Sequence, residues 1–383
     1  MNRVYLDHNA TTPVAPEVLD EMLPYLRDDF GNASSTHWWG QRARAAVERA
    51  RERVAELLGA DPAEIVFTSG GTEAANQVLR GAGEAAGAPG AVVVTSAVEH
   101  HAVLAPCARL EELGARVVRV PVDRAGVVDL DALAGALGER TVLVSVMLAN
   151  NEVGTIQPLG RVVEVARARG VPVFTDAVQA VGRIPVDVRA LGVDFLSLSG
   201  HKLYGPKGVG ALFVRRGTRV VPLLRGGEHE GGRRAGTSNV PGIVGLGRAC
   251  ELARARLDAD AARVRALRDR LEAGIRARIP DVAMNGHPSL RLPNTLSVGF
   301  PGVEGESLLM NLDLLGVAVS TGSACNAGSL RPSHVLLAMG RPPEQAHAAV
   351  RFSLGRGNTE AEVDLAIEAV ARAVTKLRAS AAS

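Results

Sequence analysis

Short β-branched runs alternate with helical stretches from about residue 65 onward. In order, the runs are "IVFTSG", "AVVVTS", "ARVVRVPV", "TVLVSVML", "VPVFTDA", "FLSLSG" and "VGALFVR". Strands that are apolar almost throughout, and that are joined by helices, indicate a mostly parallel sheet covered by helices on both faces. The pattern therefore predicts an α/β domain built on a mostly parallel seven-stranded sheet.

The pattern changes near residue 239, where a long helical stretch has apolar residues at three-to-four spacing. The runs "NTLSVGF", "GVAVS" and "AVRFSLG" are predicted strands, and an alanine-rich helix follows them. A chain of 383 residues exceeds the size at which one hydrophobic core usually stops growing. We therefore expect a large domain over 13–255 and a smaller α+β domain formed by 1–12 and 256–383.

Composition excludes several classes of partner. The formal net charge is +2 and no long basic run concentrates it, which argues against nucleic acid or an anionic membrane as the main partner. No apolar run has the length of a membrane span, and "MNRVYLDHNATTP" lacks the order of a signal peptide, so the sequence predicts a cytoplasmic location. Cys107, Cys250 and Cys325 are too widely spaced for a disulfide framework or a metal cluster.

Lysine is rare in this chain. Of the 43 lysine and arginine residues, only Lys202, Lys207 and Lys376 are lysines, and the first two lie in "SLSGHKLYGPKG". Arginine can replace lysine wherever charge alone is needed, but a guanidinium cannot act as a nucleophilic amine. Lys202 is thus a candidate for amine chemistry, with chance survival as the alternative.

The strand ends carry the other chemical residues, and ligands in such folds bind at the carboxyl ends of the strands. "TSGGTEAANQ" places Gly71 and Thr72 between a strand and a helix, where free backbone N–H groups suit a phosphate. Asp176 ends an apolar strand, where an ionised carboxylate is costly unless it is paired. Its partner is either the next helix, as a cap, or a buried cation such as a protonated ring nitrogen.

Asp176, Gln179 and Lys202 are predicted to lie at neighbouring strand ends of one sheet. A phosphate cradle, an acid for a pyridinium and an amine for an aldehyde are together what an electron-sink cofactor needs. His100, in "AVEHHAVL", could stack on a flat ring and exchange protons near neutral pH, or could simply be a packed or surface histidine.

Two glycine-rich loops remain. In "GGEHEGGRRAGT", Arg233, Arg234 and Thr237 could close over an anion, or the loop could be a flexible surface segment. "STGSACNAGS" sets Cys325 among small residues, a poor place for a core cysteine. A thiol on such a loop is a liability unless its reactivity is used. Cys107 and Cys250, in helical alanine- and leucine-rich surroundings, are interpreted as structural.

These motifs together resemble the pyridoxal-phosphate-dependent cysteine desulfurases of the class V aminotransferase-like group, in the branch that serves iron-sulfur cluster assembly and nitrogenase maturation. The resemblance covers nearly the whole chain, from "YLDHNATTP" through "FGNASSTH", "SGGTEAANQ", "VEHHAV", "NNEVGTIQP", "TDAVQAVG", "SGHKLYGPKGVGAL", "RAGT" and "GSAC" to "VRFSLGR". It implies the type I fold of pyridoxal-phosphate-dependent transferases. The asparagine after Cys325 and the tryptophans of "HWWG" depart from the family pattern.

The resemblance also implies roles for the cofactor-binding residues. Lys202 looks like the lysine that forms a Schiff base with pyridoxal 5'-phosphate. The residues that would hold the phosphate are Gly71, Thr72, Ser199, His201 and, across a homodimer, Thr237. The residues that would contact the ring are Asp176 at the pyridine nitrogen, Gln179 at the phenolic oxygen and His100 on its face.

The implied reaction converts L-cysteine to L-alanine and leaves the sulfur on Cys325 as a persulfide. Asn151 and Arg351 would hold the substrate carboxylate. The sulfur would pass to an acceptor such as an iron-sulfur scaffold protein. Two alternatives stay open: a related enzyme on the same fold, such as a selenocysteine lyase or an aminotransferase, and a non-enzymatic assembly partner that has kept the fold.

Overall fold

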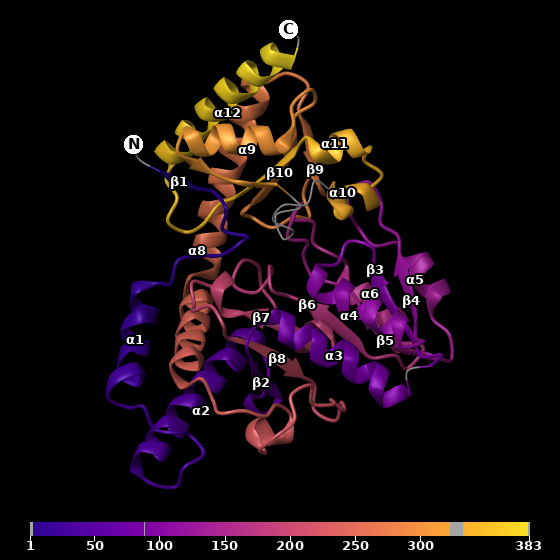
Figure 1. Cartoon of the computed structure of the whole chain (residues 1–383), viewed down its shortest axis with the longest axis vertical. Coiled ribbons are helices and arrows are strands. Elements are labelled where there is room, and N and C mark those ends of the chain that lie inside the picture. Colours follow the sequence, from indigo (N-terminus) through magenta and orange to yellow (C-terminus); the bar gives the residue numbers. More distant parts are fainter. Residues whose placement is uncertain (1–2, 88, 322–331, 382–383) are drawn as a thin grey trace.

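A seven-stranded sheet forms the centre of the larger part of the molecule (Figure 1). The computed structural model describes residues 3–87, 89–321 and 332–381. Its strands are β2 (Ile65–Thr68), β3 (Val92–Ser96), β4 (Arg116–Val120), β5 (Thr141–Ser145), β6 (Val173–Asp176), β7 (Phe195–Ser199) and β8 (Gly210–Val214). They lie in the order β2-β8-β7-β6-β5-β3-β4, and β8 alone runs antiparallel to its neighbours. The predicted mostly parallel sheet is confirmed.

Both faces of this sheet are covered, which explains why its strands are apolar almost throughout. Val93 packs against one face with α3 (Gly71–Ala86) and α4 (His101–Glu112). Its neighbour Val94 faces the opposite side. The helices that contribute to the core on that side are α1 (Pro16–Arg27), α2 (Trp38–Leu58), α5 (Leu130–Ala136), α6 (Leu159–Arg167), α7 (Val188–Leu191) and the first half of α8 (Val240–Arg278). Successive residues of a strand point to opposite faces, so each strand contributes to two cores.

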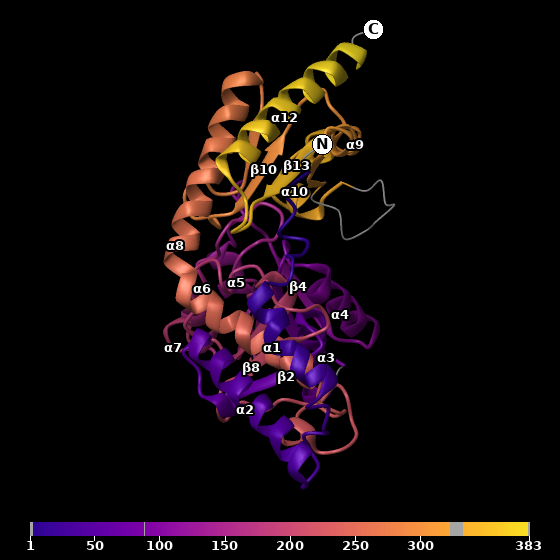
Figure 2. The same ribbon diagram turned by 90° about the vertical axis from the view of Figure 1, so that its left-hand side faces the viewer.

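The long helix α8 connects the two parts of the molecule (Figure 2). Its first half packs against α2 and against α1 (Pro16–Arg27), and its buried residues up to Leu252 belong to the core of the large sheet. From Val264 onward its buried residues join a second core, which also contains Val4 and Leu6. The domain division after residue 255 stays a prediction, and this change of packing partner along α8 is the feature that supports it.

The second core lies under a four-stranded antiparallel sheet with the order β12-β13-β10-β9. Its strands are β9 (Ala283–Asn285), β10 (Thr295–Gly299), β12 (Ser320–Thr321) and β13 (Ala349–Ser353). A parallel pair joins β1 (Val4–Tyr5) to β11 (Val317–Ala318). The remaining helices of this part are α9 (Gly305–Leu314), α10 (His334–Ala338), α11 (Pro343–His347) and α12 (Glu360–Ala381).

Sequence and structure differ in this smaller part at two places. The run "GVAVS", predicted as one strand, is divided because β11 pairs with the N-terminal strand while β12 pairs with β13. Strand β9 was not expected, since three residues are too few for a visible alternation.

None of the helices in the described ranges is long and apolar enough to cross a membrane.

Candidate active site

One cavity of about 280 Å³ brings together most of the predicted site residues, at the carboxyl ends of β5, β6 and β7. The predicted residues that line it are Gly71, Thr72, His100, Asn151, Asp176, Gln179, Ser199, His201, Lys202 and Arg351. Its volume is close to the range typical of small-molecule sites. The expectation that Asp176, Gln179 and Lys202 meet at neighbouring strand ends is confirmed, because β6 and β7 are paired.

Two predicted residues are not placed in this cavity. Thr237 is exposed in the loop before α8 and does not line it. Cys325 lies outside the described residues. The neighbouring guanidiniums are held by their own chain: Arg234 forms an ion pair with Glu73 at 2.8 Å, and Arg233 donates to backbone carbonyls, among them that of Ala63. That Arg233 and Arg234 close over an anion stays a prediction, and neither residue lines this cavity.

The N-terminus of α3 forms one wall of the cavity. Gly70, just before the helix, has a backbone φ of 152°, a value that residues with a side chain rarely adopt. A Cβ atom added to Gly71 would lie 2.5 Å from Cγ2 of Val178, so any larger residue would force Val178 to shift. The backbone N–H groups of a helix N-terminus bind anions, and Ser199 and His201 lie at the same cavity. This wall has the composition of a phosphate site.

Asp176 is not a helix cap, because β6 is followed by a turn and the next helix, α7, begins only at Val188. Its Oδ1 accepts hydrogen bonds from the Val178 N–H at 2.9 Å and from the Ser197 hydroxyl at 3.3 Å. The residue is only 7% exposed yet lines the cavity. Burial raises the pKa of Asp176, and a cation in the cavity would favour its ionised form.

Both histidines of the cavity are held neutral near pH 7. His100 caps α4 by accepting the Ala102 N–H at its Nδ1, at 3.0 Å, and burial lowers its pKa. His201 contacts the Thr11 hydroxyl through Nδ1 at 3.1 Å, and burial lowers its pKa to about 4. The capping bond fixes the His100 ring at the cavity wall, where a flat ligand could stack on it.

The amine of Lys202 follows β7 in a short 3-10 helix, Gly200–Lys202. Its Nζ donates to the backbone carbonyls of Asn9 at 2.5 Å and Ala10 at 2.6 Å. Gln179 also donates to the Asn9 carbonyl, at 3.0 Å. The N-terminal segment therefore supplies acceptors to two predicted site residues.

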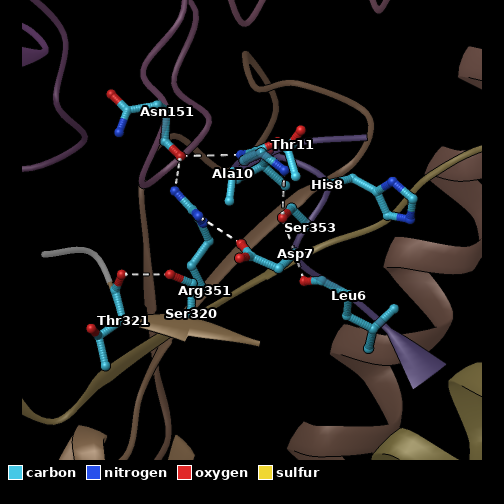
Figure 3. A network of polar contacts seen from close by, with 12 residues as sticks. Leu6, Asp7, His8, Ala10, Thr11, Asn151, Ser320, Thr321, Arg351 and Ser353 are labelled. Atoms are coloured by element: carbon cyan, nitrogen blue, oxygen red, sulfur yellow. Dashed lines mark hydrogen bonds and ion pairs between the residues drawn. The ribbon is translucent and has the colours of Figure 1, made fainter. Parts of the chain in front are cut away.

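Arg351 on β13 lines the cavity, and Figure 3 shows its guanidinium in contact with Asp7 and Asn151. Its Nη1 donates to the Asn151 carbonyl at 2.9 Å, and its Nη2 donates to Oδ1 of Asp7 at 2.8 Å. Its Nε is buried and has no hydrogen-bond partner in the described part of the chain. Because a buried unpaired donor is costly, this group is suited to an anionic ligand.

Sequence reasoning missed Asp7 and Asn9, although both lie in the quoted motif "YLDHNATTP". Asn9 is 1% exposed and its Nδ2 donates to the Asn151 carbonyl at 3.1 Å and to the Thr295 hydroxyl at 2.9 Å. Asp7 and Asn9 therefore join the N-terminal segment to both sides of the cavity. A signal that could have found them is the run of polar residues that follows the short apolar segment at the N-terminus.

Glu99 is a buried acid next to His100 in the sequence. Its protonation state can be tested by measuring how protein stability depends on pH. Its Oε1 accepts from the Ser96 hydroxyl at 2.6 Å and the Met147 N–H at 2.8 Å, and its Oε2 is buried without a partner in the described part of the chain. Burial raises the pKa of Glu99 to about 8. The folded state therefore holds a proton that the unfolded state releases near pH 4.5.

The folded protein thus becomes less stable as the pH rises from about 4.5 to about 8, because the unfolded state binds fewer protons in that window. Replacing Glu99→Gln keeps the acceptor and removes the titration, so we expect the variant to unfold at higher denaturant concentration at pH 8 and nearly as wild type at pH 5. Urea titrations at both pH values measure this. Equal stabilisation at the two pH values would contradict the assignment.

The cavity fits pyridoxal 5'-phosphate. The α3 N-terminus suits its phosphate, the buried acid of Asp176 suits a protonated ring nitrogen, and the fixed His100 ring suits its flat face. The amine of Lys202 lies at the same cavity and suits its aldehyde. The fold and this set of donors define a pyridoxal-phosphate-dependent enzyme.

The chain belongs to the class-V aminotransferase family, whose model, "Aminotransferase class-V", matches residues 4–365. It is 50% identical to "Cysteine desulfurase IscS" of Dictyoglomus turgidum over 375 residues, 98% of this chain and 95% of that relative. It is 52% identical to "Cysteine desulfurase" of Gluconacetobacter diazotrophicus over 380 residues, 99% of this chain and 95% of that relative.

Solved structures agree with these relatives. A structure named "NIFS-LIKE PROTEIN" superposes with a TM-score of 0.92 at 41% identity, covering 98% of this chain and all of that chain. "SspA in complex with cysteine" superposes with a TM-score of 0.83 at 36% identity, covering 93% of this chain and 100% of that one. The predicted family, fold class and cofactor are confirmed.

Proposed function

We propose that the chain converts L-cysteine to L-alanine as a pyridoxal-phosphate-dependent cysteine desulfurase, with the sulfur transferred to Cys325 as a persulfide. The observation that carries this proposal is the cavity in which Lys202, Asp176 and Arg351 meet. Relatives over nearly the full length are named cysteine desulfurase, and one similar structure is named as a complex with cysteine. Transfer from Cys325 to an acceptor, such as an iron-sulfur scaffold protein, follows from the same proposal.

The cofactor-binding residues act by position and charge. When bound, pyridoxal phosphate withdraws electrons from the α-carbon of an amino acid. The α3 N-terminus with Gly71, Thr72, Ser199 and His201 holds its phosphate. Asp176 would pair with a protonated ring nitrogen, and this pairing would offset the burial that raises its pKa. His100 stacks on the ring, held in place by its bond to the Ala102 N–H.

The two substrate-binding residues come from different parts of the molecule, Arg351 from β13 of the smaller sheet and Asn151 from the segment after β5 of the larger sheet. Arg351 binds the carboxylate of L-cysteine, and its buried Nε supplies a donor for one oxygen. The bonds from its Nη atoms to Asp7 and to the Asn151 carbonyl keep the guanidinium from rotating. Lys202 Nζ, close to the Asn9 and Ala10 carbonyls, is the base that takes the proton from the substrate α-carbon.

The direct test is incubation of the purified protein with pyridoxal phosphate, L-cysteine and dithiothreitol while alanine and sulfide are followed together. Equal amounts of both products support a desulfurase. An aminotransferase would instead need a keto acid and release no sulfide. A non-enzymatic assembly partner would release neither product. A selenocysteine lyase would act on L-selenocysteine and leave L-cysteine unchanged.

We further propose that the active species is a homodimer in the cytoplasm, in which Thr237 contacts the phosphate bound by the partner subunit. The exposure of Thr237, away from the cavity of its own chain, supports this arrangement. Because the phosphate site would be completed only in the dimer, dilution should weaken cofactor retention. Gel filtration combined with cofactor absorbance measures both properties, and full retention in a demonstrated monomer would refute the proposal.

A further inference from the structure

Arg183 contacts Gln179, which lines the candidate active-site cavity, but Arg183 does not line that cavity itself. Arg183 lines a second, smaller cavity of about 50 Å³, together with His8 and Tyr204. Its Nη1 donates to Oε1 of Gln179 and, at 3.3 Å, to the Gln179 backbone carbonyl. Its Nη2 donates to the His8 carbonyl at 3.1 Å. The side chain therefore joins the segment after β6 to the N-terminal segment.

These contacts decide which way the Gln179 amide points. The oxygen and nitrogen of a glutamine amide are distinguished by their hydrogen-bond partners. A guanidinium can only donate, so the atom next to Arg183 must be the oxygen. The Asn9 carbonyl can only accept, so the atom 3.0 Å from it must be the nitrogen. Two independent partners thus select the same orientation.

The consequence is a donor at the cavity. The Gln179 nitrogen carries two hydrogens, and the described residues accept only one of them, at the Asn9 carbonyl. Since Gln179 lines the cavity, the second N–H is available to a ligand. If the amide were rotated, its oxygen would face a ligand oxygen and repel it. The ligand atom opposite Gln179 must therefore be an acceptor.

Arg183 is also a cation without a carboxylate partner within the described ranges. The acceptors of its hydrogen bonds are all uncharged oxygens, and none of the ion pairs includes it. Burial lowers its pKa to about 10, so it remains a donor through neutral pH. Its charge is therefore not cancelled where it meets Gln179.

We propose that Arg183 is a positioning residue that holds Gln179 with an N–H directed at the phenolic oxygen of the cofactor and so favours the deprotonated form of that oxygen. The inference rests on the proposed function, since it takes pyridoxal phosphate as the ligand. Nothing in the reaction requires Arg183 to touch the cofactor. Its effect passes through Gln179, and this property separates it from a residue that only stabilises the fold.

The test is a pH titration of the visible absorbance of bound pyridoxal phosphate in the full-length protein, between about pH 6 and about pH 9. Removing the oriented donor disfavours the deprotonated form, so the midpoint should rise. We expect Arg183→Met to raise it by about one pH unit, a tenfold change in the protonation equilibrium. Gln179→Met should raise it by at least as much. The other titratable groups at the cavity stay the same in every variant: His100, Asp176, His201, Lys202 and Arg351.

The double variant provides the decisive comparison. If Arg183 acts through Gln179, adding Arg183→Met to Gln179→Met should not move the midpoint further, because coupled residues are non-additive. Arg183→Lys keeps a charged donor and should stay close to the wild-type midpoint. Arg189→Met, at an exposed position six residues further along, is the matched control and should titrate as wild type.

A wild-type midpoint in folded Arg183→Met, or additive shifts in the double variant, would overturn the inference. If Arg183→Met does not fold, Arg183→Ala, which also lacks a donor, replaces it, and an unchanged midpoint there overturns the inference equally. Absence of any visible band in the wild-type protein after reconstitution would overturn the proposed function, and this inference with it. A band with a normal Gln179→Met shift but no effect of Arg183 would overturn this inference alone.

Discussion

Replacing Lys202→Arg is expected to lower the rate of alanine formation from L-cysteine by at least about 10³-fold, within the range attributed to a positioned acid–base group. Arginine keeps the positive charge but cannot lose a proton near neutral pH to become a nucleophilic amine or a base. The carbonyls of Asn9 and Ala10, which accept from Lys202, can also accept from a guanidinium. The variant should therefore fold but lose activity. Circular dichroism measures its folding, and alanine formation measures its activity.

Lys207→Arg is the matched control, because Lys207 lies in the same motif but is exposed and does not line the cavity. It should retain the wild-type rate. Borohydride reduction of the protein loaded with pyridoxal phosphate, followed by peptide mass spectrometry, should find the label on Lys202. A label on Lys207 or Lys376, or substantial turnover by Lys202→Arg, would refute the assignment.

Periodicity was enough to predict the seven-stranded sheet because all of its strands except the edge strand β4 are buried almost throughout. Val93 and Val94 show the reason: adjacent residues of one strand enter different cores, so both must be apolar. The smaller sheet was harder to predict. The run "GVAVS" was predicted as one strand, yet its two ends pair with different partners. Pairing is set by segments elsewhere in the chain, β1 near the N-terminus and β13 further on, which the local pattern does not record.

The site was predictable where a side chain carries a chemistry that few residue types offer. The amine of Lys202, the acid of Asp176 and the ring of His100 fall into this class. The cavity also depends on backbone carbonyls, such as those of Asn9 and Asn151, that accept from charged side chains. Every residue has a carbonyl, so no sequence signal marks these. Their positions follow only from the fold.

Asp7 and Arg183 illustrate a second limit. Asp7 meets Arg351 across 344 residues of sequence, and Arg183 was indistinguishable in the sequence from other arginines of an arginine-rich chain. Each contacts a site residue that was predicted: Asp7 contacts Arg351, and Arg183 contacts Gln179. Residues that touch the ligand repeat a recognisable chemistry, whereas residues that orient them are defined by geometry alone.

Replacing Cys325→Ser should separate cofactor chemistry from sulfur transfer. A serine hydroxyl is nearly isosteric with a thiol but neither ionises near neutral pH nor forms a persulfide. The phosphate site, Asp176 and Lys202 are unchanged, so cofactor absorbance and its response to added L-cysteine should survive. Alanine release should fall by at least about 10²-fold, and mass spectrometry should find no sulfur added to the protein.

The other two cysteines provide the controls. Cys107 and Cys250 are buried, and burial raises the pKa of each to about 12, so neither supplies a thiolate near neutral pH. Cys107→Ala and Cys250→Ala should lose some stability by leaving small cavities but still form the persulfide. If Cys325→Ser turned over L-cysteine at the wild-type rate, sulfur would leave without a protein nucleophile. The chain would then be a lyase, and the acceptor role would pass from Cys325 to a small molecule in solution.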